Sequence, residues 1–130
     1  MILDSTALID LVRGKQEAIE KIAELTQEGI PVSTTLLSVF ELFSGLVHAQ
    51  KPQEEIERIR NILRAITKWP VTEASAERAG KIHGSLRNQG RTVEAVDCMI
   101  AAIALERNEP LLTDNTDHFS RIPGVDVEHY

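Results

Sequence analysis

Short apolar runs alternate with longer helical patterns along the whole chain, and this alternation limits the fold more than any other feature. We expect the apolar runs to form strands, and they lie at residues 1–3, 30–32, 69–71, 110–113 and 125–127. Between them, apolar residues recur at the spacing of one helix face, over residues 5–12, 18–28, 36–47, 52–66, 73–87 and 95–105. Strands that alternate with helices predict an α/β fold with a central parallel β-sheet flanked by helices on both faces. The length of 130 residues suits a single domain over residues 1–130.

Local signals indicate where several of these helices begin and end. Ser5 or Thr6 is expected to cap the first predicted helix, and Thr72 the helix that starts near residue 73. Gly14 and Gly29 follow the first two helices and are expected to end them.

The charge balance restricts how the protein can interact with nucleic acid. The formal net charge is −6, which is the wrong sign for binding a polyanion by bulk attraction. Any chemistry on nucleic acid therefore needs bound cations or a local basic patch.

The single cysteine, Cys98, excludes an internal disulfide and indicates a reducing compartment such as the cytoplasm. The longest apolar run, residues 98–105, is far shorter than the ~20 residues that a membrane-spanning helix requires. We therefore expect a cytoplasmic protein with no membrane partner, and no basic leader opens the chain.

Polar residues follow several predicted strands at the point where each strand ends. They are Asp4 and residues 33–35, 72–73 and 113–115. Because the carboxyl ends of parallel strands meet at one edge of a sheet, these side chains are candidates for a common site.

Three acidic residues stand in segments that are otherwise apolar. Asp4 follows the first strand, Glu41 lies within an apolar helix, and Asp97 is the one charged residue among residues 95–105. Each has an ordinary explanation alone: Asp4 as a helix cap, Glu41 at a helix edge, and Asp97 at a helix N-terminus. An ionised carboxylate buried without a partner is costly, and these segments contain no lysine or arginine. Together with Asp114 and Asp117 after a later strand, the set predicts a hard divalent cation with oxygen ligands.

Such a set of carboxylates suits phosphodiester chemistry. Mg²⁺ or Mn²⁺ can bind a phosphodiester, activate a water and stabilise the leaving oxygen, and two ions roughly 3.5–4 Å apart can share these roles. No histidine or cysteine cluster has the spacing of a zinc site. His48, His83 and His129 show no partner spacing in the sequence, and we expect them to be surface residues.

Four segments resemble the motifs of the PIN-domain family, and of its VapC-type toxins in particular. They are residues 2–6 (ILDST), 38–42 (SVFEL), 97–102 (DCMIAA) and 111–116 (LLTDNT). The resemblance implies a PIN-like α/β fold, Mg²⁺-dependent cleavage of RNA, a homodimer, and a cognate VapB-type antitoxin in a toxin–antitoxin pair.

The resemblance also implies roles for particular residues. Asp4, Glu41 and Asp97 correspond to metal-binding, catalytic acids of the family. Many relatives carry a fourth acid just before the phenylalanine of the closing segment, where this chain has His118. Asp114 or Asp117 could supply the fourth carboxylate, and both alternatives stay open.

Neighbouring polar residues have both a functional and a structural interpretation. Ser5 or Thr6 could orient Asp4 or touch a phosphate, or simply cap a helix. Asn115 could hold a metal-bound water or serve as a turn residue. Arg87 and Arg91 could contact the RNA backbone or be solvated.

Two remaining residues, Cys98 and Trp69, are expected to pack in the core rather than act chemically. A phosphoacceptor signalling domain is a poor alternative, because Asp4 has no acidic neighbour and Asp114 stands where a lysine is needed. A catalytically silent PIN-like interaction module is a better one, because the fourth acid is replaced by His118.

Overall fold

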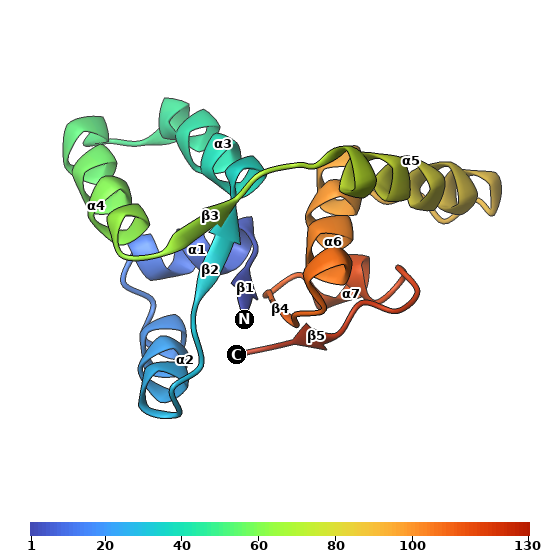
Figure 1. Ribbon diagram of the computed structural model, residues 1–130. Coiled ribbons are helices and arrows are strands. Elements are labelled where there is room, and N and C mark those ends of the chain that lie inside the picture. Colours follow the sequence, from blue (N-terminus) through green and yellow to red (C-terminus); the bar gives the residue numbers. More distant parts are fainter.

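The computed structural model describes residues 1–130 and shows a five-stranded sheet between two layers of helices (Figure 1). The strands are β1 (Ile2–Leu3), β2 (Ser33–Thr35), β3 (Thr67–Trp69), β4 (Leu111–Leu112) and β5 (Val127–Glu128). Their order in the sheet is β3-β2-β1-β4-β5, and every neighbouring pair is parallel. The predicted α/β fold with a parallel sheet is confirmed.

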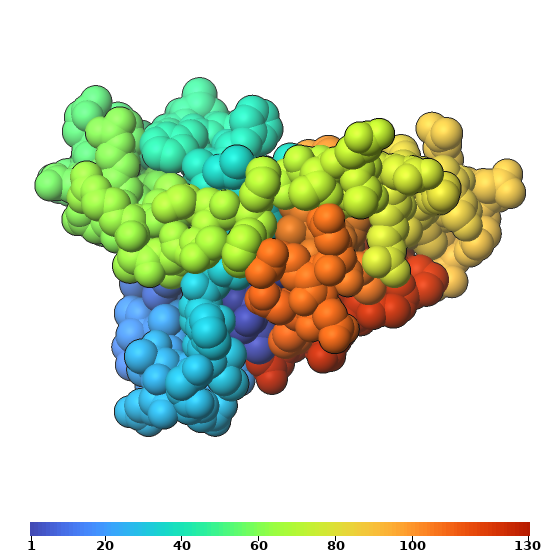
Figure 2. Space-filling model, viewed as in Figure 1, coloured from blue at the N-terminus to red at the C-terminus, as the bar shows by residue number.

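The helices divide into two groups that cover opposite faces of the sheet (Figure 1). The first group is α1 (Ser5–Val12), α2 (Gln16–Gln27), α3 (Leu36–Ser44), a 3₁₀ turn η1 (Gly45–His48) and α4 (Pro52–Arg64). The second group is α5 (Glu73–Asn88), α6 (Ala95–Arg107) and the short α7 (Thr116–Phe119). Figures 1 and 2 show α5 projecting from the body of the molecule. None of these helices combines the length and the apolar character that a membrane span requires.

The two faces of the central strands build two separate apolar cores. Ile2 and Leu111 contribute to the core beneath α5, α6 and α7. Leu3 and Leu112, the next residues along the same strands, contribute to the core beneath α1 to α4. Successive side chains of a strand point to opposite faces, so both β1 and β4 must be apolar throughout.

The second strand is not where the apolar pattern predicted it. Strand β2 is Ser33–Thr35 rather than residues 30–32, because Ser33 is the residue in register with Ile2. The polar strand is fully buried, and Thr34 satisfies its hydroxyl by donating to the carbonyl of Leu3 at 2.7 Å. An apolar run is therefore a poor guide where hydroxyl side chains find partners in the sheet.

The third strand is likewise shifted toward the N-terminus. Strand β3 is Thr67–Trp69 rather than residues 69–71, and it pairs with β2 in parallel. Pro70 follows it directly and has no backbone N–H to donate to a ladder.

Helix ends differ from the prediction at two places and agree at another. Asp4, not Ser5 or Thr6, caps α1, and its carboxylate accepts the backbone N–H of Ala7 at 2.9 Å. Thr72 caps α5 as predicted. The helix predicted over residues 36–47 ends as α-helix at residue 44 and continues as η1, and α7 was not predicted.

Candidate active site

The order of the strands selects one edge of the sheet as the place for a site. The chain moves outward from β1 to β2 and β3 on one side, and β4 and β5 lie on the other side. In open parallel sheets ligands bind outside the carboxyl ends of the strands at such a reversal of direction. Asp4 follows β1 and Thr113 follows β4, so both lie at this position.

The carboxylate of Asp4 is buried and held on several sides. Asp4 is 3% exposed. Its carboxylate accepts hydrogen bonds from the hydroxyls of Thr6 and Thr113 and from the backbone N–H of Ala7. Burial raises the pKa of Asp4 to about 6, and the three hydrogen bonds only partly oppose this effect. The negative charge of Asp97 adds to the increase, so these two acids are close enough to repel each other.

Asp97 lies in the first turn of α6 and is half-buried. Burial raises its pKa, and the charges of Glu41 and Glu94 raise it further. His118 opposes the increase, with its Nδ1 atom 3.6 Å from Asp97 Oδ2. Asp97 therefore stands between two carboxylates and one imidazole.

Glu41 reaches the same region from α3, where it accepts a hydrogen bond from the hydroxyl of Ser5. Behind this contact, the hydroxyl oxygen of Ser38 lies 3.3 Å from that of Ser5 and 3.3 Å from that of Thr35. Thr35 is also the residue that caps α3. The hydroxyls thus connect the starts of α1 and α3.

The three acids that the sequence identified lie between β1 and α1, in α3 and in α6, and they interact electrostatically. No lysine or arginine forms an ion pair with Asp4, Glu41 or Asp97. We call these three residues the acidic site. The groups that face its charge are hydrogen-bond donors, the N-terminus of α6 and the imidazole beside Asp97.

The other two candidate acids lie outside this group. The side chain of Asp114 is 45% exposed, 2.9 Å from Nε2 of His129 and 3.9 Å from Nζ of Lys15. Asp117 is exposed on α7, and its carboxylate makes no hydrogen bond or ion pair. His129 is exposed, as expected for a surface residue, and the end of β5 brings it next to Asp114.

Asn115 and His118 form a pair beside the acidic site. The amide nitrogen of Asn115 lies 2.9 Å from Nδ1 of His118, and its backbone N–H donates to the hydroxyl of Thr113. The residue that replaces the fourth acid is therefore in contact with Asp97 and forms part of the site's rim.

The donor chemistry of the acidic site fits a hard divalent ion, although the side chains are not preassembled around a single point. No three carboxylate, imidazole or thiol groups of residues 1–130 converge as metal ligands. The oxygens of Asp4 and Glu41 are instead turned toward the hydroxyls of Thr113 and Ser5. Carboxylate oxygens without a protein cation are the ligands that Mg²⁺ prefers, so Asp4, Glu41 and Asp97 fit such an ion chemically.

Thr113 and Ser38 lie behind the acidic site. The sequence placed Thr113 among the polar residues at the sheet edge without giving it a role, and it did not single out Ser38. Both are fully buried. The one signal in the sequence that points to these two hydroxyls is their position within apolar segments. That signal is not specific, because hydroxyl residues are common at the ends of strands and helices.

Cys98 and Trp69 pack in or against the core, as predicted. Cys98 is fully buried, and Trp69 packs against the core beneath α6, with the guanidinium carbon of Arg107 3.1 Å from its ring centroid. Arg87 and Arg91 are exposed and form no ion pair.

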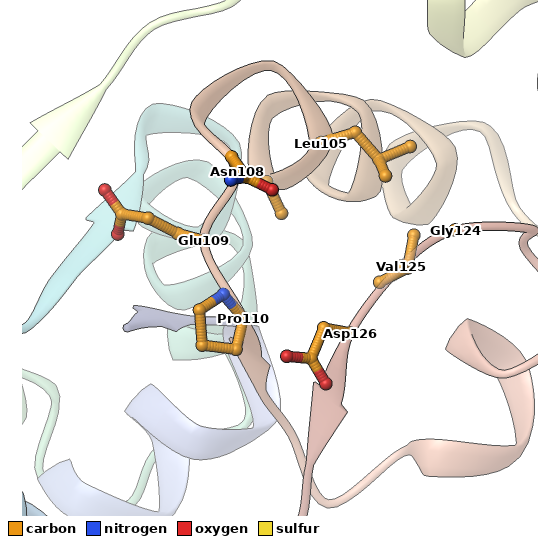
Figure 3. Close-up of a pocket in the computed structure, with 8 residues that line it drawn as sticks. Leu105, Asn108, Glu109, Pro110, Gly124, Val125 and Asp126 are labelled. Carbon is orange, nitrogen blue, oxygen red and sulfur yellow. The ribbon is translucent and has the colours of Figure 1, made fainter.

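A small pocket of about 70 Å³ lies at the opposite edge of the sheet (Figure 3). Pro110 and Asp126, which line it, precede β4 and β5, and Asn108 follows the end of α6. The pocket therefore lies at the amino ends of the strands and shares no residue with the acidic site.

Comparison with known proteins supports the class that the fold and the acids define. The PIN domain model matches residues 1–125. Ribonuclease VapC19 of Mycobacterium tuberculosis is 30% identical over 124 residues, which are 95% of each chain. The tRNA(fMet)-specific endonuclease VapC of Shigella flexneri is 29% identical over 129 residues, which are 99% of this chain and 96% of the relative. The chain belongs to the PIN-domain family.

Solved structures agree with this assignment. The VapBC2 complex of Rickettsia felis bound to a promoter DNA fragment contains a chain that matches with a TM-score of 0.89 at 18% identity, over 99% of this chain and 97% of that one. The DNA-bound VapBC of Salmonella typhimurium matches with a TM-score of 0.86 at 24% identity, over 98% and 96%. These likenesses establish the fold, and together with the relatives they place the chain among the VapC-type proteins of that family.

Proposed function

We propose that the chain is a Mg²⁺-dependent endoribonuclease, the toxin component of a VapBC toxin–antitoxin system. The observation that carries the proposal is the acidic site: three carboxylates from distant segments, without a protein cation, at the carboxyl edge where the strand order reverses. Relatives with the names ribonuclease and tRNA-specific endonuclease support RNA as the substrate.

Asp4, Glu41 and Asp97 would hold the ion, with Mn²⁺ as an alternative to Mg²⁺. When bound, a divalent ion supplies a Lewis acid for the phosphoryl oxygen and lowers the pKa of a water that attacks phosphorus. The chain's own residues position the ligands. Thr113 and Thr6 hold the Asp4 carboxylate by donating to it.

The start of α1 and the start of α6 contribute further to the site. Ser5 orients Glu41 by its hydroxyl hydrogen bond. Asp97 lies where the partial positive charge of the α6 N-terminus favours a carboxylate. His118, at the rim, can donate a hydrogen bond from Nε2 to a phosphate, because its Nδ1 faces the amide nitrogen of Asn115.

Cleavage of an end-labelled RNA in Mg²⁺ and in EDTA tests the proposal. We expect cleavage in Mg²⁺ or Mn²⁺ alone, and its loss in both Asp4→Asn and Asp97→Asn. Asp126→Asn is the matched control, because it removes the same charge from an exposed carboxylate at the opposite edge of the sheet. Cleavage that persists in both site variants would refute the assignment.

A catalytically silent PIN-like module is the second candidate, and the observation that favours it is His118 in the place of a fourth acid, beside Asp97. Mn²⁺ binding measured by calorimetry, with no cleavage of any RNA tested, would support this alternative. Cleavage that requires the acidic site would exclude it.

We also propose a VapB-type antitoxin and a second copy of the chain as partners. The structural neighbours are VapBC complexes, which supports the antitoxin. Leu36, Phe40 and Val47 of α3 and η1 are 50%, 66% and 80% exposed, an apolar surface that a dimer contact would cover. Sedimentation of the chain should show a dimer that Phe40→Glu converts to monomer, and a monomeric wild type would refute the dimer.

A further inference from the structure

A groove of about 280 Å³ lies between α5, α6 and the segment after α7. Arg78, Lys81, Arg91 and Arg121 line it together with the amide of Gln89, and none of its lining residues is acidic. We call these five residues the basic groove. In a chain with a net charge of −6, four cations around one cavity form the kind of local basic patch that nucleic-acid binding would need.

The cations of the basic groove are available to a ligand. Arg78, Arg91 and Arg121 form no ion pair. The Nζ atom of Lys81 lies 3.3 Å from Oε1 of Glu77, but the two side chains are 77% and 69% exposed, respectively. An exposed pair of this kind contributes little, so a phosphate can replace the carboxylate at small cost.

The packing of α5 along α6 directs the basic groove toward the acidic site. Thr72, just before α5, donates to Glu106 near the end of α6 at 2.8 Å, so the two helices run antiparallel. The other end of α5, with Gln89 and Arg91, therefore lies beside the start of α6. The first turn of α6 carries Asp97.

The dimensions of the basic groove suit a nucleic-acid strand. From Arg78 to Gln89 the axis of α5 rises by ~16 Å, at ~1.5 Å per residue. Even the ~3.4 Å rise per nucleotide of a double-helical strand is far shorter than this length, so the basic groove is long enough to meet more than one phosphate. Arg121 is fixed on the opposite wall, where its guanidinium donates to the carbonyl of Thr92 at 3.4 Å.

We propose that the basic groove binds the phosphate backbone of RNA and leads the strand to the acidic site. This inference rests on the proposed ribonuclease function and adds the surface that would hold the substrate. Arginine and lysine donate charge-assisted hydrogen bonds to phosphate oxygens, which position a strand without reading its sequence. The basic groove thereby offsets the repulsion between RNA and an acidic protein.

Binding of a fluorescently labelled RNA stem–loop in EDTA, followed by anisotropy over a range of salt concentrations, tests the inference without any cleavage. The double variant Arg78→Gln/Arg91→Gln should bind on the order of tenfold more weakly at near-physiological salt. The slope of log affinity against log salt should fall by about 1.5 to 2, because two phosphate contacts are lost. Both side chains are exposed, and circular dichroism should show unchanged folding.

The matched control is Arg58→Gln/Arg60→Gln on α4, on the other side of the molecule from α5 (Figure 1). These two arginines are also exposed and form no ion pair, so the control removes the same charge from a different place. Near-wild-type binding by the control supports the basic groove. An equal loss in both double variants, or no loss in the α5 variant, overturns it.

The same experiment separates this inference from the proposed function. If RNA binds through the basic groove but is not cut in Mg²⁺, the nuclease proposal fails and the groove stands. If wild type and the α5 variant bind RNA equally while cleavage occurs in Mg²⁺, the groove fails and the nuclease stands.

Discussion

The acidic site and the basic groove are two charged regions at neighbouring ends of α5 and α6, and they are built in opposite ways. The carboxylates are wholly or partly buried, come from three distant segments, and are held by hydroxyl groups. The cations are mostly exposed, three of the four belong to α5 and the loop after it, and only Arg121 is anchored by a hydrogen bond. Buried charges require fixed partners, whereas exposed ones act through water and are screened by salt. Substitutions in the acidic site should therefore have large effects that depend little on salt, and those in the basic groove modest effects that depend on it strongly.

The largest effect should come from Glu41→Gln. The variant keeps the shape of the side chain and the contact with Ser5 but removes one of three charges that would hold a divalent ion. An ion worth several kcal/mol to the transition state implies a loss of cleavage on the order of a thousandfold. Single-turnover cleavage in Mg²⁺ measures it, and Glu55→Gln on α4 is a control that removes the same charge elsewhere. A loss below about tenfold would contradict a shared acidic site.

A stability measurement with Asp4→Asn should show the next largest effect. The pKa of Asp4 is raised from 3.8 to about 6 in the folded protein, so the folded state binds more protons than the unfolded state between these values. Stability contributed by this group is thus present at low pH and lost as pH rises through about 6.

Without metal, the asparagine variant should be more stable than wild type at pH 7 by up to about 3 kcal/mol, since asparagine can also cap α1. The difference should vanish near pH 4, and Mg²⁺ should stabilise wild type but not the variant. Urea unfolding at the two pH values checks this. Equal stability at pH 7 would show that the buried charge is compensated by the protein alone.

Thr113→Val should have an intermediate effect on cleavage. The valine has a similar shape but cannot donate to Asp4, and groups that orient metal ligands typically affect metal affinity or activity by 10- to 100-fold. The concentration of Mg²⁺ needed for half-maximal cleavage should rise, and Thr113→Ser should restore it. An unchanged Mg²⁺ requirement in the valine variant would limit Thr113 to a packing role.

The smallest effect should come from Asp114→Asn. Its carboxylate is nearly half exposed and already lies next to His129 and Lys15, so we expect less than about a fivefold loss of cleavage and a stability change within about 0.5 kcal/mol. A loss as large as that of Glu41→Gln would instead show that Asp114 turns inward to become the fourth acid. This measurement decides whether Asp114 supplies the fourth carboxylate.

The sequence predicted the acids better than the strands around them, for a physical reason. A carboxylate in an apolar segment is a local anomaly, visible at Asp4, Glu41 and Asp97 without knowledge of the fold. Strand β2 was misplaced because its residues, Ser33–Thr35, are polar, and the burial of Thr34 depends on the hydrogen bond that its hydroxyl donates to the Leu3 carbonyl.

Sequence alone established the class of fold, the apolar character of β1 and β4, and the three acids in apolar segments, because hydrophobic periodicity and the cost of burying charge are properties of short segments. The meeting of those acids, the hydroxyls of Thr113 and Ser38 behind them, and the convergence of Arg78 with Arg121 depend on how distant segments pack. Contacts across many residues of chain leave no periodic signal in either partner. Only the folded arrangement of the sheet and its helices brings these side chains together.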